Sequence, residues 1–366
     1  MSRSMAVAFL AVAALAAWAL QAAAAADADE VAVQLERLKS DRWIVRRGAV
    51  VRLGQLGPVS DEVIPALVGA LDDPHQGVRE VAAKALSRMG PAAAPAVPSL
   101  ARALGDKYKG VRQWSAITLG GLGEKAKAAG PVLVDRLADR DPWVRSAAAE
   151  ALVKIDFETD RAARAMAADL TNEQFGAKTN ALDALDKMGP KAAPAAAALI
   201  KMLREEKNPT LRAMAAMALG KIGPPAAEPA VPGLTASLTH PDYNLRAQAA
   251  TALARIDPKT AREKALPVMV EQLGDAEPYA RMYAAVALYR IDREAGREKS
   301  APVLAALVAN SDWRVRVHAA GNLGRMGRDA ASALPALRRA AGDPNQYVRK
   351  AAAEALAAIE GAKGGS

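Results

Sequence analysis

Three histidines are the side chains best suited to metal binding or general base catalysis: His75, His240 and His318. They lie far apart in the sequence, none is followed by glutamate, and the chain has no cysteine to supply a thiolate ligand. The sequence also lacks a Gly-x-Ser-x-Gly nucleophile elbow, a phosphate-binding P-loop and a His-Glu-x-x-His zinc motif. We therefore expect no catalytic residue, no metal site and no cofactor.

A second possible chemistry is phosphate binding, because basic side chains recur at steps of 33 to 35 residues. They are Arg46, Arg79, Arg112, Arg145, Lys178, Arg212, Arg246, Arg281, Arg316 and Arg349. Six residues before each stands, in turn, Ser40, Asp73, Asp106, Asp139, Asn172, Glu206, His240, Asp275, Asn310 or Asp343. A guanidinium bonded to such an acceptor presents little free charge, so a structural role is favoured over a phosphate-binding stripe.

Aromatic side chains gather within four residues before these basic positions. They are Trp43, Tyr108, Trp143, Phe175, Tyr243, Tyr279, Trp313 and Tyr347. Such rings can bind a ligand, or they can cover the start of a helix and pack on a neighbour. Packing in the core is the favoured interpretation, and the place where the rings are densest is the best candidate for a specific contact site. This predicted patch consists of Tyr279, Tyr283, Trp313 and His318.

The elements that must position these residues are helices. Around each basic residue, apolar positions follow spacings of 4, 4 and 3, which is one face of an α-helix, and a leucine stands seven residues after it in all ten copies. Glycine or aspartate then ends this helix A, and proline opens a second helix B in most copies. A small residue at the position shared by Gly54, Gly120, Gly220 and Gly324 predicts a close approach of helices. Alanine and leucine dominate the 51% hydrophobic content, and nothing indicates a sheet.

The repeated segment, as in DPHQGVREVAAKALSRMG (73–90), resembles the HEAT-repeat family, especially its short phycobilisome lyase-like form. The resemblance covers residues 30–360. It implies an all-α, right-handed α-α superhelix of about ten two-helix repeats. It also implies a ladder in which each repeated arginine bonds the turn of its own or the next repeat.

The N-terminal segment 1–26 has the pattern of a signal peptide, with Arg3 before an apolar run and small residues before Asp27. An uncleaved anchor helix is the alternative. Cleavage lowers the formal net charge from +9 to +8, since it removes Arg3 and no acid. We expect a single solenoid over 27–360, with a half-repeat at 30–40, a last repeat truncated after helix A, and a flexible tail at 361–366.

These features predict an exported, non-catalytic scaffold of the bacterial periplasm or cell envelope that binds a protein or peptide. Arg338 and Arg339 form the clearest basic pair for an acidic partner. The resemblance leaves two alternatives. One is a lyase- or oxidoreductase-like member, since phycobilisome lyases and deoxyhypusine hydroxylases share such repeats. The other is a nucleic-acid binder similar to HEAT-like DNA glycosylases. We expect no nucleic acid and no membrane contact beyond the signal.

Overall fold

The computed structural model describes residues 27–361, and these form helices joined by turns, without a strand. The predicted signal peptide at 1–26 and the predicted tail beyond Gly361 lie outside the described residues. No helix in the described range has the length and hydropathy needed to span a membrane. The chain divides between Asp169 and Leu170 into two compact units, and each unit is an α-α solenoid. That they form one continuous solenoid over 27–360 stays a prediction.

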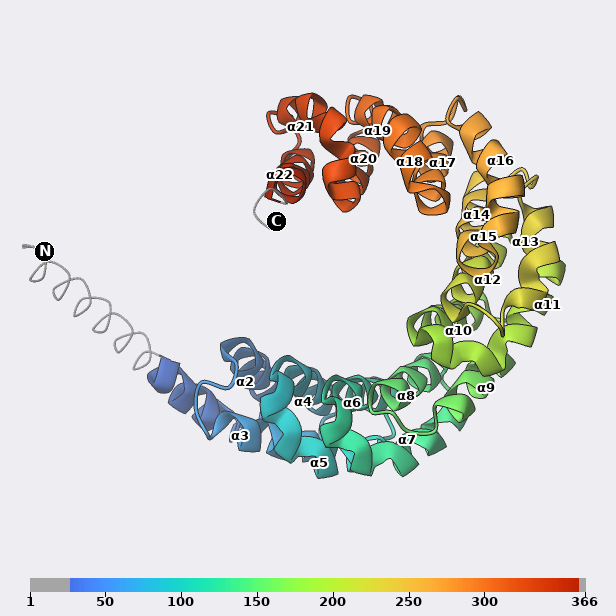
Figure 1. Cartoon of the computed structure of the whole chain (residues 1–366). Coiled ribbons are helices and arrows are strands. Elements are labelled where there is room, and N and C mark those ends of the chain that lie inside the picture. Colours follow the sequence, from blue (N-terminus) through green and yellow to red (C-terminus); the bar gives the residue numbers. More distant parts are fainter. Residues whose placement is uncertain (1–26, 362–366) are drawn as a thin grey trace, which may run out of the picture. The chain divides into compact units, whose positions relative to one another are not determined.

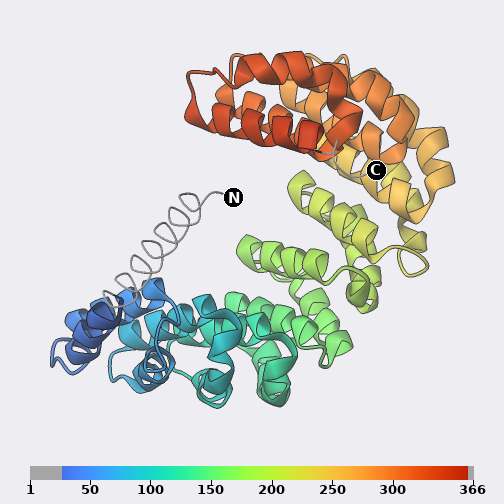
Figure 2. The ribbon, with the colours of Figure 1, turned by 60° about the vertical axis from the view of Figure 1, so that its left-hand side comes forward.

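Unit 1 begins with a helix at 27–37, which overlaps the predicted half-repeat at 30–40, and continues as two rows of helices (Figure 1, Figure 2). The helix A row contains α2 (Trp43–Leu56), α4 (Gln76–Arg88), α6 (Lys109–Gly121) and α8 (Pro142–Lys154). The helix B row contains α3 (Val63–Gly69), α5 (Val97–Ala103), α7 (Gly130–Asp135) and α9 (Thr159–Asp169). Short 3₁₀ turns flank these helices at Ala70–Asp72, Gly90–Ala96, Gly123–Ala129 and Arg136–Ala138. Within the unit, neighbouring helices A contact each other in the pairs α2–α4, α4–α6 and α6–α8.

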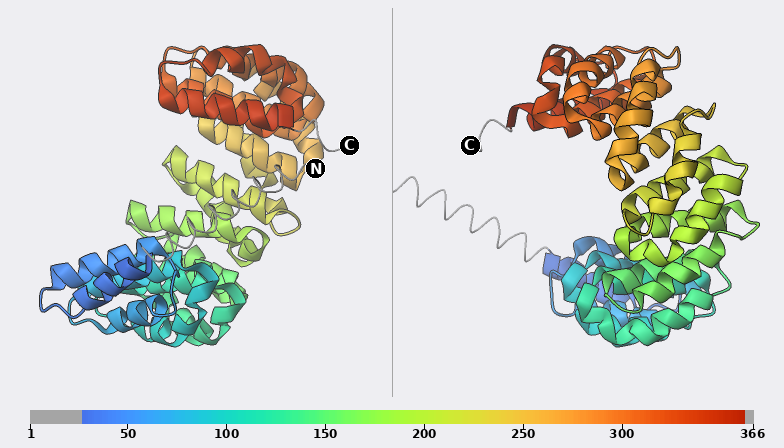
Figure 3. Two further views of the ribbon diagram at one scale, coloured as in Figure 1. Left: turned by 90° about the vertical axis from the view of Figure 1, so that its left-hand side faces the viewer. Right: turned by 45° about the vertical axis from the view of Figure 1, so that its right-hand side comes forward.

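Unit 2 repeats the pattern, with helices A on the inner side of its bend and helices B on the outer side (Figure 1, Figure 3). Its helices A are α10 (Phe175–Met188), α12 (Pro209–Ile222), α14 (Tyr243–Ile256), α17 (Pro278–Ile291), α20 (Trp313–Met326) and α22 (Gln346–Gly361). Its helices B are α11 (Ala196–Glu205), α13 (Val231–Ser237), α16 (Leu266–Gln272), α19 (Ala301–Leu307) and α21 (Leu334–Ala340). Its 3₁₀ turns are Gly189–Ala195, Glu228–Ala230 and Gly327–Ala333. Two single-turn helices, α15 (Pro258–Thr260) and α18 (Arg293–Ala295), lead into π-helical turns at Ala261–Ala265 and Gly296–Ser300.

The ends of helix A follow two different rules. Six glycines have a positive φ between 55° and 81°, as expected for a residue that closes a helix: Gly57, Gly90, Gly123, Gly189, Gly223 and Gly327. Asp156 also has a positive φ of 52°. Asp257 and Asp292 end α14 and α17, as the sequence predicted, because each is the C-cap residue of its helix A. Their φ is near −140°, and their carboxylates also cap α15 and α18. At those two positions the aspartate ends one helix and starts the next.

Helices A of neighbouring repeats approach closely where glycine meets alanine, as the repeated small residue predicted. A Cβ on the glycine would lie 2.7–3.1 Å from the alanine in the pairs Gly54–Ala85, Gly120–Ala151, Gly220–Ala252 and Gly324–Ala355. Tyr289 occupies the glycine position in α17, and α17 contacts α20 much less than other neighbouring helices A contact each other. A bulky ring at this position therefore separates two helices that would otherwise pack closely.

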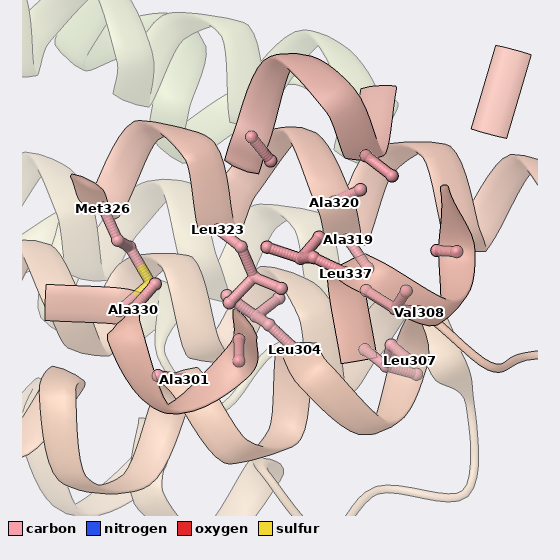
Figure 4. Packing of buried hydrophobic residues seen from close by; sticks show 14 of the residues in the cluster. Ala301, Leu304, Leu307, Val308, Ala319, Ala320, Leu323, Met326, Ala330 and Leu337 are labelled. Atoms are coloured by element: carbon pink, nitrogen blue, oxygen red, sulfur yellow. The ribbon is translucent and has the colours of Figure 1, made fainter. Parts of the chain in front are cut away.

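The core lies between the two rows. The repeated leucine is fully buried in nine copies, from Leu53 to Leu323, and half-buried only at Leu356 of α22, which no following helix covers in the described chain. Figure 4 shows one such layer, in which Leu304 of α19, Leu323 of α20 and Leu337 of α21 meet. Removing these apolar side chains from water is the main favourable contribution to stacking.

Two adjacent glycines in α6 test the close approach directly. We expect Gly120→Ala to lower the free energy of unfolding by about 1–3 kcal/mol, because the new methyl would lie 2.9 Å from the Ala151 Cα. Gly121→Ala is the matched control, since a Cβ there meets nothing within 4 Å, and we expect it to be neutral or slightly stabilising. Urea unfolding followed by circular dichroism measures both, and equal effects of the two substitutions would contradict this packing.

Candidate functional site

The repeated arginines lie between the turns that precede successive helices A. Arg112 of α6 donates from Nε and Nη2 to the two carboxylate oxygens of Asp139 in the next repeat, both at 2.7 Å. Its Nη1 donates to the carbonyl oxygens of Asp106 and Lys107 in its own turn, at 2.9 and 3.2 Å. One side chain therefore joins its own turn to the next, and we call this arrangement a rung. The two charged side chains are only 5% and 4% exposed.

Unit 1 contains rungs at each of its repeated arginines. Two-pronged bonds of 2.6–2.9 Å join the pairs Arg46–Asp73, Arg79–Asp106, Arg112–Asp139 and Arg145–Asp169. Asp169, at the end of α9, lies three residues before Asn172, the turn residue that the repeat pattern predicts as the partner of Arg145. Burial opposes ionisation of Asp139, but the Arg112 hydrogen bond, the Asp141 N–H and the Arg112 charge together hold its pKa below the ordinary value.

The turn residue itself has a second role that all ten copies share. Its side chain accepts the backbone N–H two residues later, at 2.8–3.3 Å. Aspartate, asparagine, glutamate, the Ser40 hydroxyl and the His240 Nδ1 all serve as the acceptor. Each turn therefore requires a side chain that accepts a hydrogen bond at this position. The side chain needs a negative charge only where the arginine of the previous repeat bonds to it.

In the middle of unit 2 the rungs are incomplete. The turns that follow Arg212 and Arg281 carry histidine and asparagine in place of an acid. Arg212 bonds the Leu203 carbonyl, and Arg281 bonds only the carbonyls of its own turn. Arg246 reaches Asp275 only at 3.9 Å, and its buried Nε has no hydrogen-bond partner.

Toward the two ends of unit 2, the repeated basic residue again bonds an acid of the next turn. Lys178 forms a single bond of 2.7 Å to Glu206, because an ammonium lacks the two-pronged geometry of a guanidinium. Arg316 forms a full rung with Asp343 at 2.8 and 3.0 Å. Arg349 bonds the carbonyls of its own turn.

Four helices A of unit 2, α14, α17, α20 and α22, carry paired rings. The pairs are Tyr243–Tyr283, with ring centroids 5.7 Å apart, Tyr279–His318 at 6.4 Å and Trp313–Tyr347 at 5.6 Å. We call these six residues the aromatic strip. Each pair joins one helix A to the next, near their N-terminal ends. The rings are half-buried, except for His318 and Tyr347, which are exposed. The structure thus brings the four predicted aromatic residues into one row.

Charged groups surround the strip. The Arg314 guanidinium lies over the Trp313 ring, 4.9 Å from its centroid. Burial, and then the charge of Glu277, raise the pKa of Tyr243 above its ordinary value. Toward the C-terminal end of α17, Tyr289 inserts between α17 and α20, and its hydroxyl bonds the Asp329 carboxylate at 2.7 Å. The strip therefore includes the two neighbouring helices A of unit 2 that pack least closely.

The predicted basic pair lies apart from these rings, on helix B α21. Arg338 bonds Glu360 at 2.9 Å and is largely exposed. Arg339 lines a hollow of about 420 Å³ together with Asn310 and Pro344. The structure thus places the aromatic and basic candidates on different rows of helices.

The three histidines have separate roles. His75 stacks on Trp43 at 3.8 Å and accepts the Gly77 N–H, His240 serves as a turn acceptor, and His318 belongs to the strip. Within residues 27–361, no three histidine, cysteine, aspartate or glutamate side chains gather as metal ligands.

Tyr243 and Tyr347 complete the strip, although the sequence did not place them in the predicted patch. The sequence did indicate them, because both lie among the aromatic residues that precede a repeated arginine. What the sequence could not show is that each ring reaches a partner on the neighbouring helix A.

The chain matches a family model described as HEAT repeats over residues 6–87, 31–120, 70–153, 97–186, 231–314 and 300–364. No curated protein matches it. Among solved structures, importin beta in an ammonium sulfate condition is 13% identical, with 92% of this chain and 54% of that chain covered and a TM-score of 0.53. An engineered protein is 24% identical, with 90% and 99% covered and a TM-score of 0.46. At such identities the likeness to importin beta shows the fold alone.

The rung of Arg112 provides a stability test. We expect Arg112→Met to lower the free energy of unfolding by about 3 kcal/mol, because Asp139 is left buried without its partner. The same change in Arg349→Met, where no acid is bonded, should cost much less. Urea midpoints of the full chain measure both, and similar losses for the two variants would mean that the bond between repeats contributes little.

Proposed function

The chain belongs to the HEAT-repeat family, and from this premise we propose that it is an exported, non-catalytic scaffold whose aromatic strip binds a protein or peptide. The proposal rests above all on the strip itself. Three ring pairs on four helices of one unit present large, amphipathic side chains at the surface of a stacked scaffold. Tyrosine and tryptophan are enriched among the residues that contribute most to protein interfaces.

The order of the strip favours binding. Each ring is held by a ring from a neighbouring helix, so its side chain loses less conformational freedom when a partner arrives. The half-buried rings retain accessible edges, and the tyrosine hydroxyls can donate hydrogen bonds to a partner backbone. A packing role alone does not require the exposure of Tyr347, which is 56% exposed.

Export and location in the bacterial periplasm or cell envelope are part of the same proposal, and they rest on the signal-like segment at 1–26. Cleavage before Asp27 would release the scaffold in soluble form. Arg338 and Arg339, on the other row of helices, would add a contact for an acidic part of the partner.

Site-specific photocrosslinking in intact cells tests the proposal. We expect a crosslinker at Tyr283 to capture a defined protein, while one at Trp143, an exposed turn aromatic of unit 1, does not. With the purified partner, Tyr347→Ala and His318→Ala together should weaken affinity about tenfold or more, because ring contacts are lost, and Trp143→Ala should change it less than about twofold.

Mass spectrometry of the captured product also reads the mature N-terminus, expected at Asp27. Equal capture at both positions, or unchanged affinity in the double variant, would refute the role of the strip. A mature chain that keeps residues 1–26 would refute the proposed cleavage.

A further inference from the structure

A second surface feature of unit 2 lies along the middle and C-terminal parts of α12, α14 and α17. A pocket of about 240 Å³ opens between α12 and α14. Its lining consists of Met217, Gly220, Lys221, Gln248, Thr251, Ala252, Arg255 and Arg290. None of these residues belongs to the aromatic strip. Gly220 lies directly against Ala252, so the two helices form a tight floor between the longer side chains.

The cations of this pocket belong to a row that the repeat places in register. Nine residues after the repeated basic residue, five consecutive copies in unit 2 carry Lys187, Lys221, Arg255, Arg290 and Arg325. Gln248, Thr251 and Arg255 stand two, five and nine residues after Arg246. Side chains at these spacings project from the same side of an α-helix. The row therefore shares the helix A face with Gln248 and Thr251.

Three members of the row, Arg255, Arg290 and Arg325, have no countercharge in the described chain, and Arg325 bonds only the Asn322 amide oxygen. Within residues 27–361, neither Arg255 nor Arg290 has a hydrogen bond or ion pair to a carboxylate, whereas Lys221 bonds Asp186. Desolvation, and then the charges of Arg255 and Arg325, lower the pKa of Arg290 from its usual value. The guanidinium groups of Arg255, Arg290 and Arg325, on the successive helices α14, α17 and α20, therefore repel one another at this surface.

The helix dipole accounts for only part of this arrangement. A cation in the last turn of a helix is stabilised by the partial negative charge of that end. This effect explains each cation singly. It does not explain why arginines on adjacent helices converge on one pocket without an acid among them, and an anionic ligand would relieve the repulsion.

The pocket also offers neutral groups suited to a small anion. Gln248 lies beside the cations, and Thr251 contributes a hydroxyl that bonds no protein group in the described chain. Met217 supplies an apolar wall that can contact the methylene groups of an acidic side chain. We propose that this pocket binds a carboxylate of an acidic segment in the partner protein.

The shape favours a carboxylate over a nucleic-acid backbone. A volume of about 240 Å³ suits one acidic side chain, and the Met217 wall gives nothing to a phosphodiester. Arginine bonds a carboxylate in a two-pronged geometry, as the rungs of this chain show. The inference depends on the proposed function only in taking the ligand to be a protein segment, and its site is independent of the strip.

Fluorescence anisotropy with a labelled oligoglutamate peptide tests the pocket without the native partner. At about physiological salt, we expect saturable binding to the full chain and none with oligoglutamine. Arg255→Gln combined with Arg290→Gln should weaken binding at least about tenfold. Arg262→Gln combined with Arg297→Gln, an equal loss of charge at exposed positions of the same unit, should weaken it less than about twofold.

A substitution within the pocket separates specific binding from general charge attraction. Met217→Glu places a carboxylate beside the arginines, so it should raise the thermal midpoint and block the peptide, whereas Met217→Gln should do neither. No peptide binding, equal weakening by both double variants, or peptide blockade by Met217→Gln as well would overturn the proposal. Selective binding of single-stranded DNA in place of the peptide would also overturn it. Each of these results leaves the crosslinking test of the strip unaffected.

Discussion

An arginine that bonds two turns at once fixes how one repeat aligns with the next, and the rest of the structure differs according to where this bond is present. Apolar burial provides most of the cohesion between repeats, but it is not directional and would tolerate sliding of one hairpin on the next. The Arg112 guanidinium removes that freedom, because its Nη1 is fixed to its own turn while Nε and Nη2 are fixed to Asp139 in the following repeat. A repeat that shifts or opens would leave a buried charge without its partner, so the rung stabilises one register over the others.

The two units use this interaction differently. Unit 1 carries an unbroken series from Arg46 to Arg145, whereas Arg212, Arg246 and Arg281 in unit 2 lack a close acid. The cationic pocket and two ring pairs of the aromatic strip lie across these weakened contacts. Tyr289 adds to the same effect by separating α17 from α20. The third pair, Trp313–Tyr347, lies across the complete rung of Arg316. A binding surface that must adapt to a partner benefits from looser joints, and low local stability is typical of such regions.

Much of the fold follows from local pattern in the sequence. Helix A and its buried leucine could be predicted because a helical face repeats with every copy, and the small residue at position 120 predicted the close contact with the next helix A, where Ala151 lies.

The bond from Arg145 to Asp169 could not be predicted, because this acid lies outside the repeat register. The aspartates at 257 and 292 end helix A as predicted, but their second role as the N-cap of the next short helix was not predicted, because both roles fall on the same position. The aromatic row was visible, whereas its ring pairs depend on the distance between helices. The cation row was also present in the sequence, but the pocket depends on Arg290 reaching toward α14.

Hydrogen exchange on the full chain tests most directly whether rungs decide how firmly repeats are joined. Opening free energies from the amides of α4 and α6, which complete rungs hold, can be compared with those of α14 and α17, where the rungs are incomplete. The account predicts slower exchange in α4 and α6, by about tenfold or more, since a hydrogen bond to a charged group contributes about 1.5–3 kcal/mol. Equal protection in the two sets, or stronger protection in α14 and α17, would contradict it.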